Sequence, residues 1–209
     1  HMEAGNRCFS DLVPEEINRR VVDTCSDVHM PYTERSRANL IQAGYPSNKI
    51  FVTGNPIYEI LLANRTDTEI LNQMNLTKDK YILVTAHRQE NVDNLTRLIH
   101  LLSACDDLMS AYKVPLIFSR HPRTKKKIEL VRMNNHKGIT FHEPFGLLDF
   151  LTLERNALLV VTDSGTVQEE CCILHVRCVT IRDVTERPET IECGSNILSG
   201  INPESILRC

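Results

Sequence analysis

The segment 162–170 joins a tight turn to a helix start in a way that suits phosphate binding. It reads Thr-Asp-Ser-Gly-Thr-Val-Gln-Glu-Glu and follows an apolar run. Unpaired backbone N–H groups at a helix N-terminus favour an anion, Gly165 lets the backbone approach it closely, and Ser164 adds a hydroxyl donor. Glu170, about one turn further, is placed to accept hydrogen bonds from ribose hydroxyls. The alternative is an Asp-Ser-Gly turn that merely caps a helix.

Two further polar segments follow apolar runs. In Thr-Ala-His-Arg-Gln-Glu-Asn at 85–91, His87 can act as an acid or base near neutral pH or donate to a phosphate. The alternative is a histidine bonded within its own loop. In Arg-Asp-Val-Thr-Glu-Arg-Pro-Glu at 182–189, Arg187 offers a planar fork that suits phosphate or carboxylate. A surface charge cluster would explain it equally well.

Two carboxylates lie near the N-terminus, Glu3 in His-Met-Glu-Ala-Gly and Glu15 in Pro-Glu-Glu. Paired carboxylates in a cleft can have separated pKa values and divide acid and base work between them. The second segment is also an ordinary helix start, with proline first and acids in the first turn.

A framework that could position these residues is visible from residue 81 onward, where short apolar runs alternate with helical patterns. The runs are continuous, as in a parallel sheet covered on both faces. This rhythm predicts a doubly wound α/β domain, whose ligands bind beyond the carboxyl ends of the strands. The predicted strands are 81–85, 115–119, 139–141, 158–162 and 178–181, and the predicted helices are 95–112, 124–134, 147–155 and 167–174.

The first 64 residues have a different pattern. Helices are predicted at 15–24, 33–43 and 56–63, but strands only at 28–30 and 50–53. Two strands are too few for an independent sheet. We therefore expect residues 1–64 to be the C-terminal remnant of a first domain and residues 65–209 to be a second domain, with the polar stretch 64–79 as the connection.

Composition limits the classes of function. The net charge of -3 gives no general attraction to nucleic acid or anionic membranes, so we expect neither partner. No apolar run approaches the roughly 20 residues of a membrane span. The eight cysteines show no zinc-type spacing, and we expect reduced, mostly buried thiols and a cytoplasmic protein without a metal.

Eight motifs in order give a more specific reading. The chain resembles the non-hydrolysing UDP-N-acetylglucosamine 2-epimerase family along essentially its whole length. The motifs are His-x-Glu-Ala-Gly at 1–5, Pro-Glu-Glu-x-Asn-Arg at 14–19, Ser-Asp at 26–27, Tyr-Thr-Glu at 32–34, Thr-Gly-Asn-Pro at 53–56, Thr-Ala-His-Arg-x-Glu-Asn at 85–91, Asp-Ser-Gly-x-x-Gln-Glu-Glu at 163–170 and Arg-Asp-x-Thr-Glu-Arg-Pro-Glu at 182–189.

The resemblance implies a GT-B architecture, two Rossmann-like domains with the active site between them, of which residues 65–209 would be the UDP-binding half. It implies acid/base roles at the sugar for Glu3 and Glu15. It implies that His87 lies at the diphosphate and sugar. UDP-sugar contacts would also come from Ser164, Gly165, Glu170 and Arg187, with Arg7 and Arg120 as weaker candidates.

Three departures from the family pattern affect what can be expected. The family usually has Gly-Gly where this chain has Gly165-Thr166, and the run at 6–9 differs from the commoner Leu-Arg-Ser/Thr. Both features are similar to branches that make N-acetylfucosamine-type sugars, so UDP-N-acetylglucosamine and a 6-deoxy analogue both remain candidate substrates. Roughly a hundred residues, with a further catalytic aspartate, precede the first motif in the family. We therefore expect a fragment, and we assign His1 no role.

The mechanism that the resemblance implies is anti elimination of UDP and its re-addition on the other face, without metal or organic cofactor. The whole parent would be a homodimer. The alternatives are a GT-B glycosyltransferase, a hydrolysing epimerase, or a fragment that binds nucleotide without chemistry. For the chain as it stands, we expect UDP binding with little or no turnover.

Overall fold

A computed structural model describes residues 1–130 and 138–209, and its centre is one all-parallel sheet. The sheet has six strands in the order β3-β2-β1-β4-β5-β6, and every neighbouring pair is parallel. This confirms the predicted doubly wound α/β class. The strands are β1 (Ile82–Ala86), β2 (Leu116–Arg120), β3 (Ile139–His142), β4 (Leu159–Thr162), β5 (Cys178–Thr180) and β6 (Asn196–Leu198).

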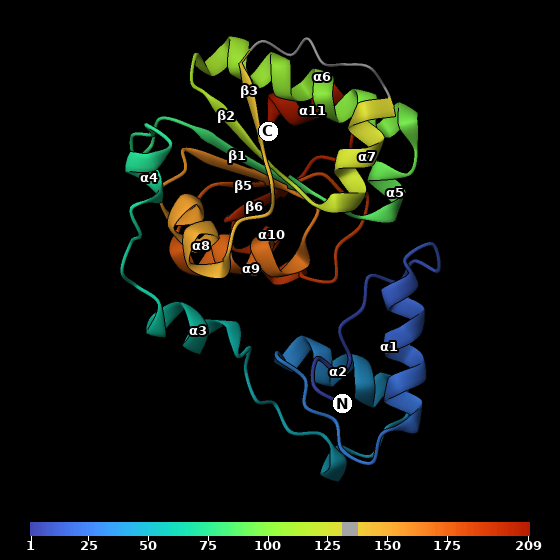
Figure 1. The fold of residues 1–209 in the computed structure, drawn as a ribbon. Helices are drawn as coiled ribbons and strands as arrows, with labels where there is room; N and C mark the ends of the chain where they lie inside the picture. Colours follow the sequence, from blue (N-terminus) through green and yellow to red (C-terminus); the bar gives the residue numbers. More distant parts are fainter. Residues whose placement is uncertain (131–137) are drawn as a thin grey trace.

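Helices cover both faces of the sheet (Figure 1). On one face lie α5 (Gln89–Val92), α6 (Leu95–Tyr112), α7 (Pro122–Leu130) and α11 (Pro203–Arg208). The other face carries α8 (Leu147–Arg155), α9 (Gly165–Leu174) and α10 (Pro188–Glu192), with α4 (Ile70–Gln73) packed on α8. Among the described residues, no helix is both long enough and apolar enough to cross a bilayer.

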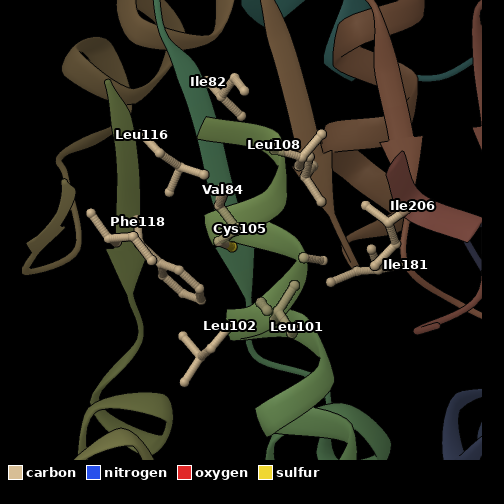
Figure 2. Close-up of a cluster of buried hydrophobic side chains, with 14 of the residues drawn as sticks. Ile82, Val84, Leu101, Leu102, Cys105, Leu108, Leu116, Phe118, Ile181 and Ile206 are labelled. Atoms are coloured by element: carbon tan, nitrogen blue, oxygen red, sulfur yellow. The ribbon is translucent and has the colours of Figure 1, made fainter. Parts of the chain in front are cut away.

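Alternation along the strands builds two cores, one on each face. Ile82 and Val84 of β1 pack with Leu102 and Leu108 of α6, as Figure 2 shows for this side of the sheet. Leu83, between them in sequence, points to the opposite core beneath α8 and α9. Because both faces are covered, each central strand is apolar at nearly every position, which is why continuous apolar runs predicted these strands.

The predicted strands and helices of this domain are confirmed to within three residues where they can be compared. Helix α6 matches the prediction, and the Asn94 side chain caps it by accepting from the N–H groups of Thr96 and Arg97. Strand β6 was missed because it has only three residues at the sheet edge, too few for a periodic pattern. The predicted helix over 124–134 runs past residue 130 into 131–137, which lie outside the described residues.

The N-terminal part holds α1 (Pro14–Cys25), α2 (Glu34–Gln42), a short 3-10 turn (Ser47–Lys49) and α3 (Ile57–Ala63). The predicted strands at 28–30 and 50–53 are wrong as strands. Only two isolated parallel bridges form there, Met2 with Met30 and His29 with Ile50. Backbone hydrogen bonds run from His29 N to Lys49 O, from Phe51 N to His29 O and from Thr53 N to Pro31 O, but Pro31 has no N–H to continue the ladder.

Helix α3 links the two parts of the chain. Its residues Ile57 and Leu61 pack against Leu151 of α8 and Ile173 of α9. The apolar side of α3 is thus buried on the sheet domain, although α3 precedes residue 65. The boundary proposed between residues 64 and 65 therefore falls after α3, although α3 already packs on the sheet domain.

Candidate functional site

The site lies where the strand order reverses. Strand β1 pairs with β2 on one side and β4 on the other, so their carboxyl ends flank the topological switch point. Asp163, fully buried after β4, ties the two ends together. Its carboxylate accepts from the backbone N–H groups of His87 and Arg88, at 3.0–3.1 Å, and from the Asn91 side-chain amide at 3.1 Å. The loop after β1 is therefore fixed against the start of α9.

His87 is held in this loop with a partly exposed ring. Its Nδ1 lies 3.5 Å from Asp163 Oδ1, and its ring centroid is 6.0 Å from that of His121. With Glu15 and Arg88, both histidines line a cavity of about 370 Å³ between the front part of the chain and the sheet domain. A carboxylate neighbour on one side and an open cavity on the other suit an imidazole that exchanges or donates a proton.

Helix α9 starts directly at the switch point. Ser164 is its N-cap and accepts from the N–H of Val167 at 3.4 Å. A Cβ atom on Gly165 would lie 3.1 Å from Glu186 Oε1 and 3.7 Å from Arg187 Cζ. The helix N-terminus and the Arg187 guanidinium are thus in near contact, and only glycine leaves the space between them open.

Arg187 is buried among carboxylates from three segments. Its Nη2 lies 2.5 Å from Glu3 Oε1, its Nε 2.8 Å from Glu169 Oε1, and its Nη1 3.7 Å from Glu186 Oε1. Burial would lower the pKa of Arg187, but these carboxylates outweigh burial and raise it. The guanidinium therefore stays charged in a site largely closed to water.

Glu186 balances the arginines of the site. Its Oε1 lies 3.4 Å from Arg19 and 3.6 Å from Arg88, and its Oε2 2.9 Å from Arg182. Burial alone would raise its pKa, but the arginine charges, Arg182 and Arg187 foremost, lower it to about 2. The carboxylate is therefore ionised across the physiological range.

Glu3 reaches this cluster from a strained backbone. Its φ is +65°, a conformation that costs a non-glycine residue of order 1–3 kcal/mol. Its carboxylate lies 3.1 Å from Arg19 and also contacts Arg187. Two residues on, Gly5 also has positive φ, and a Cβ there would come within 2.1 Å of Ser36 O. The turn is therefore specified by its sequence and directs Glu3 into the cleft.

Glu15 sits in the first turn of α1, and its Oε1 lies 2.6 Å from Arg88 Nη1. Both predicted carboxylates thus face the sheet domain, each beside an arginine of the site. Some donors there lack a hydrogen-bond partner. Among the described residues, Arg19 Nε and Nη1 are buried and make no hydrogen bond, and neither does Arg187 Nη1, although Glu186 Oε1 lies 3.7 Å from it. An anion entering the cleft can therefore gain N–H contacts without displacing every carboxylate.

The structure links the predicted residues through contacts, except for Glu170. Glu3 and the Ser164-Gly165 helix start lie beside Arg187, and Arg88, which pairs with Glu186, joins this cluster to the cavity lined by His87 and Glu15. Glu170 lies on the side of α9 that faces Glu154 of α8, and burial raises its pKa to about 7. Arg7 points away from the cleft and binds Asp23 at 2.5 Å. Arg120 lies at the end of β2, 3.3 Å from Glu143. His1 also pairs with Asp23, at 2.6 Å.

Sequence reasoning did not single out Arg19, Arg88, Asp163, Glu169 and Glu186. All five sit in motifs whose other members were chosen, because the motif marks a segment but not which of its side chains turn inward. Glu186 is only one residue from Arg187, and its near-complete burial is the signal that identifies it. A buried carboxylate requires partners, which single-sequence patterns do not show.

The fold and this cleft define the class of doubly wound α/β proteins whose ligand site opens at the topological switch point. The family model for UDP-N-acetylglucosamine 2-epimerase matches residues 1–209. The chain belongs to this family, as the ordered motifs predicted.

Several relatives support the assignment. The UDP-N-acetylglucosamine 2-epimerase of Methanocaldococcus jannaschii is 44% identical over 219 residues, which is 100% of this chain and 60% of the relative. A UDP-2,3-diacetamido-2,3-dideoxy-D-glucuronate 2-epimerase of Pseudomonas aeruginosa is 34% identical, and the match covers 100% of this chain and 58% of that relative. The chain thus spans about three fifths of the length of these relatives.

Solved structures agree. The M. jannaschii enzyme in complex with UDP-GlcNAc and UDP superposes with a TM-score of 0.93 at 44% identity, over 100% of this chain and 60% of that one. The enzyme of Rickettsia bellii gives a TM-score of 0.88 at 38% identity, over 100% and 56%. The sheet domain and the front part therefore share the arrangement of known family members.

Proposed function

We propose that this chain supplies the UDP-binding half and part of the sugar-binding half of a UDP-N-acetylamino-sugar 2-epimerase. The observation that carries the proposal is that the Ser164-Gly165 helix start lies beside Arg187, and that Arg88 joins this cluster to the cavity lined by His87. These groups come from three different strand ends, and each suits a diphosphate. The buried N–H groups of Arg19 that make no hydrogen bond support the same proposal.

The chemistry follows from what C2 inversion requires. A base removes the C2 proton as the bond from C1 to the UDP oxygen breaks, giving a 2-acetamidoglucal and UDP. Protonation at the opposite face of C2, with UDP re-added at C1, then gives the epimer. Glu3 and Glu15 are our candidates for part of the acid and base work. His87, Arg187 and the α9 terminus would stabilise the leaving diphosphate.

We propose Glu170 for the ribose hydroxyls on the strength of the family motif, and this role requires its side chain to turn from Glu154, which it faces in this structure. The substrate is UDP-N-acetylglucosamine or a 6-deoxy analogue. The relatives act on more than one UDP-sugar, since one is named for a 2,3-diacetamido glucuronate. We propose that the whole protein is a homodimer. For the 209-residue chain we propose nucleotide binding with little or no turnover, because it spans only about three fifths of its active relatives.

Calorimetric titration of the 209-residue chain with UDP and with uridine tests the binding proposal. UDP should bind at least about tenfold more tightly, because its anionic diphosphate, which neutral uridine lacks, meets buried N–H donors. Arg187→Lys keeps the charge but loses the fork, and it should weaken UDP binding by roughly tenfold. The matched control Arg208→Lys alters an exposed arginine paired only with Glu204 and should change nothing. Equal affinities for UDP and uridine would rule the diphosphate site out.

Turnover is tested separately by following UDP-N-acetylglucosamine alone by NMR. Epimerisation needs no acceptor, whereas a glycosyltransferase does, and a hydrolysing enzyme releases UDP with free sugar. We expect UDP binding without any of these products. Formation of the C2 epimer by this chain would show that its own residues suffice for catalysis.

A further inference from the structure

Two cysteines on neighbouring helices lie side by side outside the cleft. Cys172 is in the last turns of α9, and Cys193 is the C-cap of α10. Their Sγ atoms are 3.7 Å apart, and both are free thiols. A disulfide needs about 2.05 Å between sulfurs, so a small rotation of the side chains closes the gap. Contrary to the sequence expectation, only half of the eight cysteines are buried, and Cys193 is exposed.

The surroundings make the two thiols unlike. Interactions with the side chain and backbone of Ser195, whose Oγ lies 3.4 Å from Cys193 Sγ, lower the pKa of Cys193. Burial raises the pKa of Cys172. Thiolate is the reactive form and exposure governs access, so Cys193 has the properties of an attacking thiol and Cys172 those of a resolving one.

We propose that Cys172 and Cys193 form a reversible intramolecular disulfide when the protein meets a peroxide. The Cys193 thiolate attacks one oxygen of hydrogen peroxide, the O–O bond breaks, and hydroxide leaves to give a sulfenic acid. The Cys172 thiolate then attacks that sulfur, the S–O bond breaks, and water forms with the proton released by Cys172. Peroxide is the two-electron oxidant, and any dithiol reductant reverses the step.

The disulfide would strengthen the contact between α9 and α10, which already positions Gly165 and Arg187. One turn before Cys172, Gln168 Nε2 donates to Arg187 O at 3.3 Å and to Thr190 Oγ1 at 2.5 Å. Cys193 Sγ in turn lies 3.4 Å from Thr190 O. The disulfide thus extends the contact between α9, which carries Ser164 and Gly165, and α10, which begins next to Arg187. It closes a loop of 21 residues, and we expect a higher thermal midpoint after oxidation.

The test is peroxide treatment of the fully reduced 209-residue chain at about one equivalent, followed by tryptic mapping. Trypsin does not cut between Arg187 and Pro188, so the expected product is peptide 156–177 joined to peptide 183–208. The joined pair should disappear on reduction. Dimedone, which traps sulfenic acids, should label Cys193 in the Cys172→Ser variant.

Controls separate this pair from general thiol oxidation. Cys25→Ser removes an exposed thiol elsewhere and should leave the joined peptide unchanged. Cys193→Ser should abolish it, with unaltered circular dichroism as the check on folding. Persistence of the joined peptide in Cys172→Ser would assign the bond to Cys171 and overturn the proposal. Faster dimedone labelling of Cys25 or Cys209 than of Cys193 would overturn it as well. Neither readout depends on nucleotide binding.

Discussion

Glu186 is the residue on which most of the site charge depends. It is almost completely buried and lies within 4 Å of four arginines, namely Arg19, Arg88, Arg182 and Arg187. A buried ion pair is expensive to break from one side, because the remaining charge keeps its desolvation cost. The carboxylate therefore stabilises the folded site even though it is not itself a candidate for contact with substrate.

Replacing Glu186 with glutamine tests this residue. Glu186→Gln keeps the shape and removes the charge, so we expect a loss of about 3 kcal/mol of folding stability and a thermal midpoint lower by roughly 10 °C. Glu204→Gln, in an exposed pair with Arg208, is the matched control and should shift the midpoint by under about 1 °C.

The stability difference between wild type and Glu186→Gln should depend on pH, because folding lowers the pKa of Glu186. A carboxyl whose pKa falls on folding adds stability above its unfolded pKa of about 4.5, and the gain is lost as pH falls toward 2. Calorimetric midpoints of wild type and Glu186→Gln should therefore converge as pH is lowered from 5 toward 3. A constant difference across that range would mean that the charge is not what Glu186 contributes.

At this scale, residue type and position after a strand were enough to select His87, Ser164, Gly165 and Arg187 as candidate site residues. They were not enough to find Glu186 or Arg88, because a charge is informative only once its burial is known. Glu170 shows that a motif does not fix the direction of a side chain. Its neighbour Glu169 faces Arg187, whereas Glu170 faces Glu154, because a shift of one position on a helix turns a side chain by about 100°.

The interface between helices α8 and α9 buries two carboxyl groups, those of Glu154 and Glu170. Glu154 is fully buried, and Cys171 Sγ donates to its Oε1 at 3.1 Å. Burial and the neighbouring Glu170 raise the pKa of Glu154, and burial raises that of Glu170 to about 7. Two carboxyls facing each other between apolar helices cannot both be ionised cheaply.

We expect the two carboxyl groups between α8 and α9 to make the free energy of unfolding fall as pH rises through neutrality. Above about pH 4.5 the unfolded chain releases both protons, whereas the folded chain keeps that of Glu170 until about pH 7 and holds that of Glu154 through its raised pKa, so folding binds protons there. We expect a loss on the order of 2 kcal/mol between pH 5 and 8. The Glu154→Gln/Glu170→Gln double variant should have a flat profile in urea titrations over this range. An equal slope in the double variant would place the proton uptake elsewhere.

Helices and strands were easier to predict from the sequence than the contacts of individual side chains. The strands of the sheet and helix α6 follow from apolar runs and a helical stripe, because burial on both faces leaves a strong one-dimensional signal. The short strand β6 and the single bridges at His29 and Met30 do not follow. Their hydrogen bonds depend on partners far away in sequence, and so few residues carry no period.

Helix α3 packs its apolar side on the sheet domain, and the remaining contacts between the two parts described above are made by charged side chains. Arg187 reaches Glu3 across 184 residues of sequence, and Arg19 reaches Glu186 across 167. Arg35 and Glu192 add an exposed pair at 2.7 Å. Which arginine meets which glutamate could not be predicted from sequence, since the chain offers many of each and the pairing depends on how the parts dock.

Such an interface should open and close. Two structures of the same M. jannaschii enzyme, each 44% identical to this chain, give TM-scores of 0.93 and 0.77. The structure with UDP-GlcNAc and UDP is the one that matches this chain better. For this chain we expect contacts made by exposed and partly buried charges to separate more readily than a packed apolar core would.

Small-angle scattering can test this at the level of the whole chain. A compact protein of this length has a radius of gyration of about 17 Å. Without UDP, raising the salt from about 0.05 to 1 M shortens the screening length to about 3 Å and should increase the radius by roughly 1 Å. Saturating UDP should suppress the increase. Glu3→Gln weakens the contact with Arg187 and should expand at lower salt, whereas Glu34→Gln, an exposed carboxylate in the front part, should behave as wild type. A radius independent of salt, UDP and Glu3 would show that packing, and not the ion pairs, fixes the two parts together.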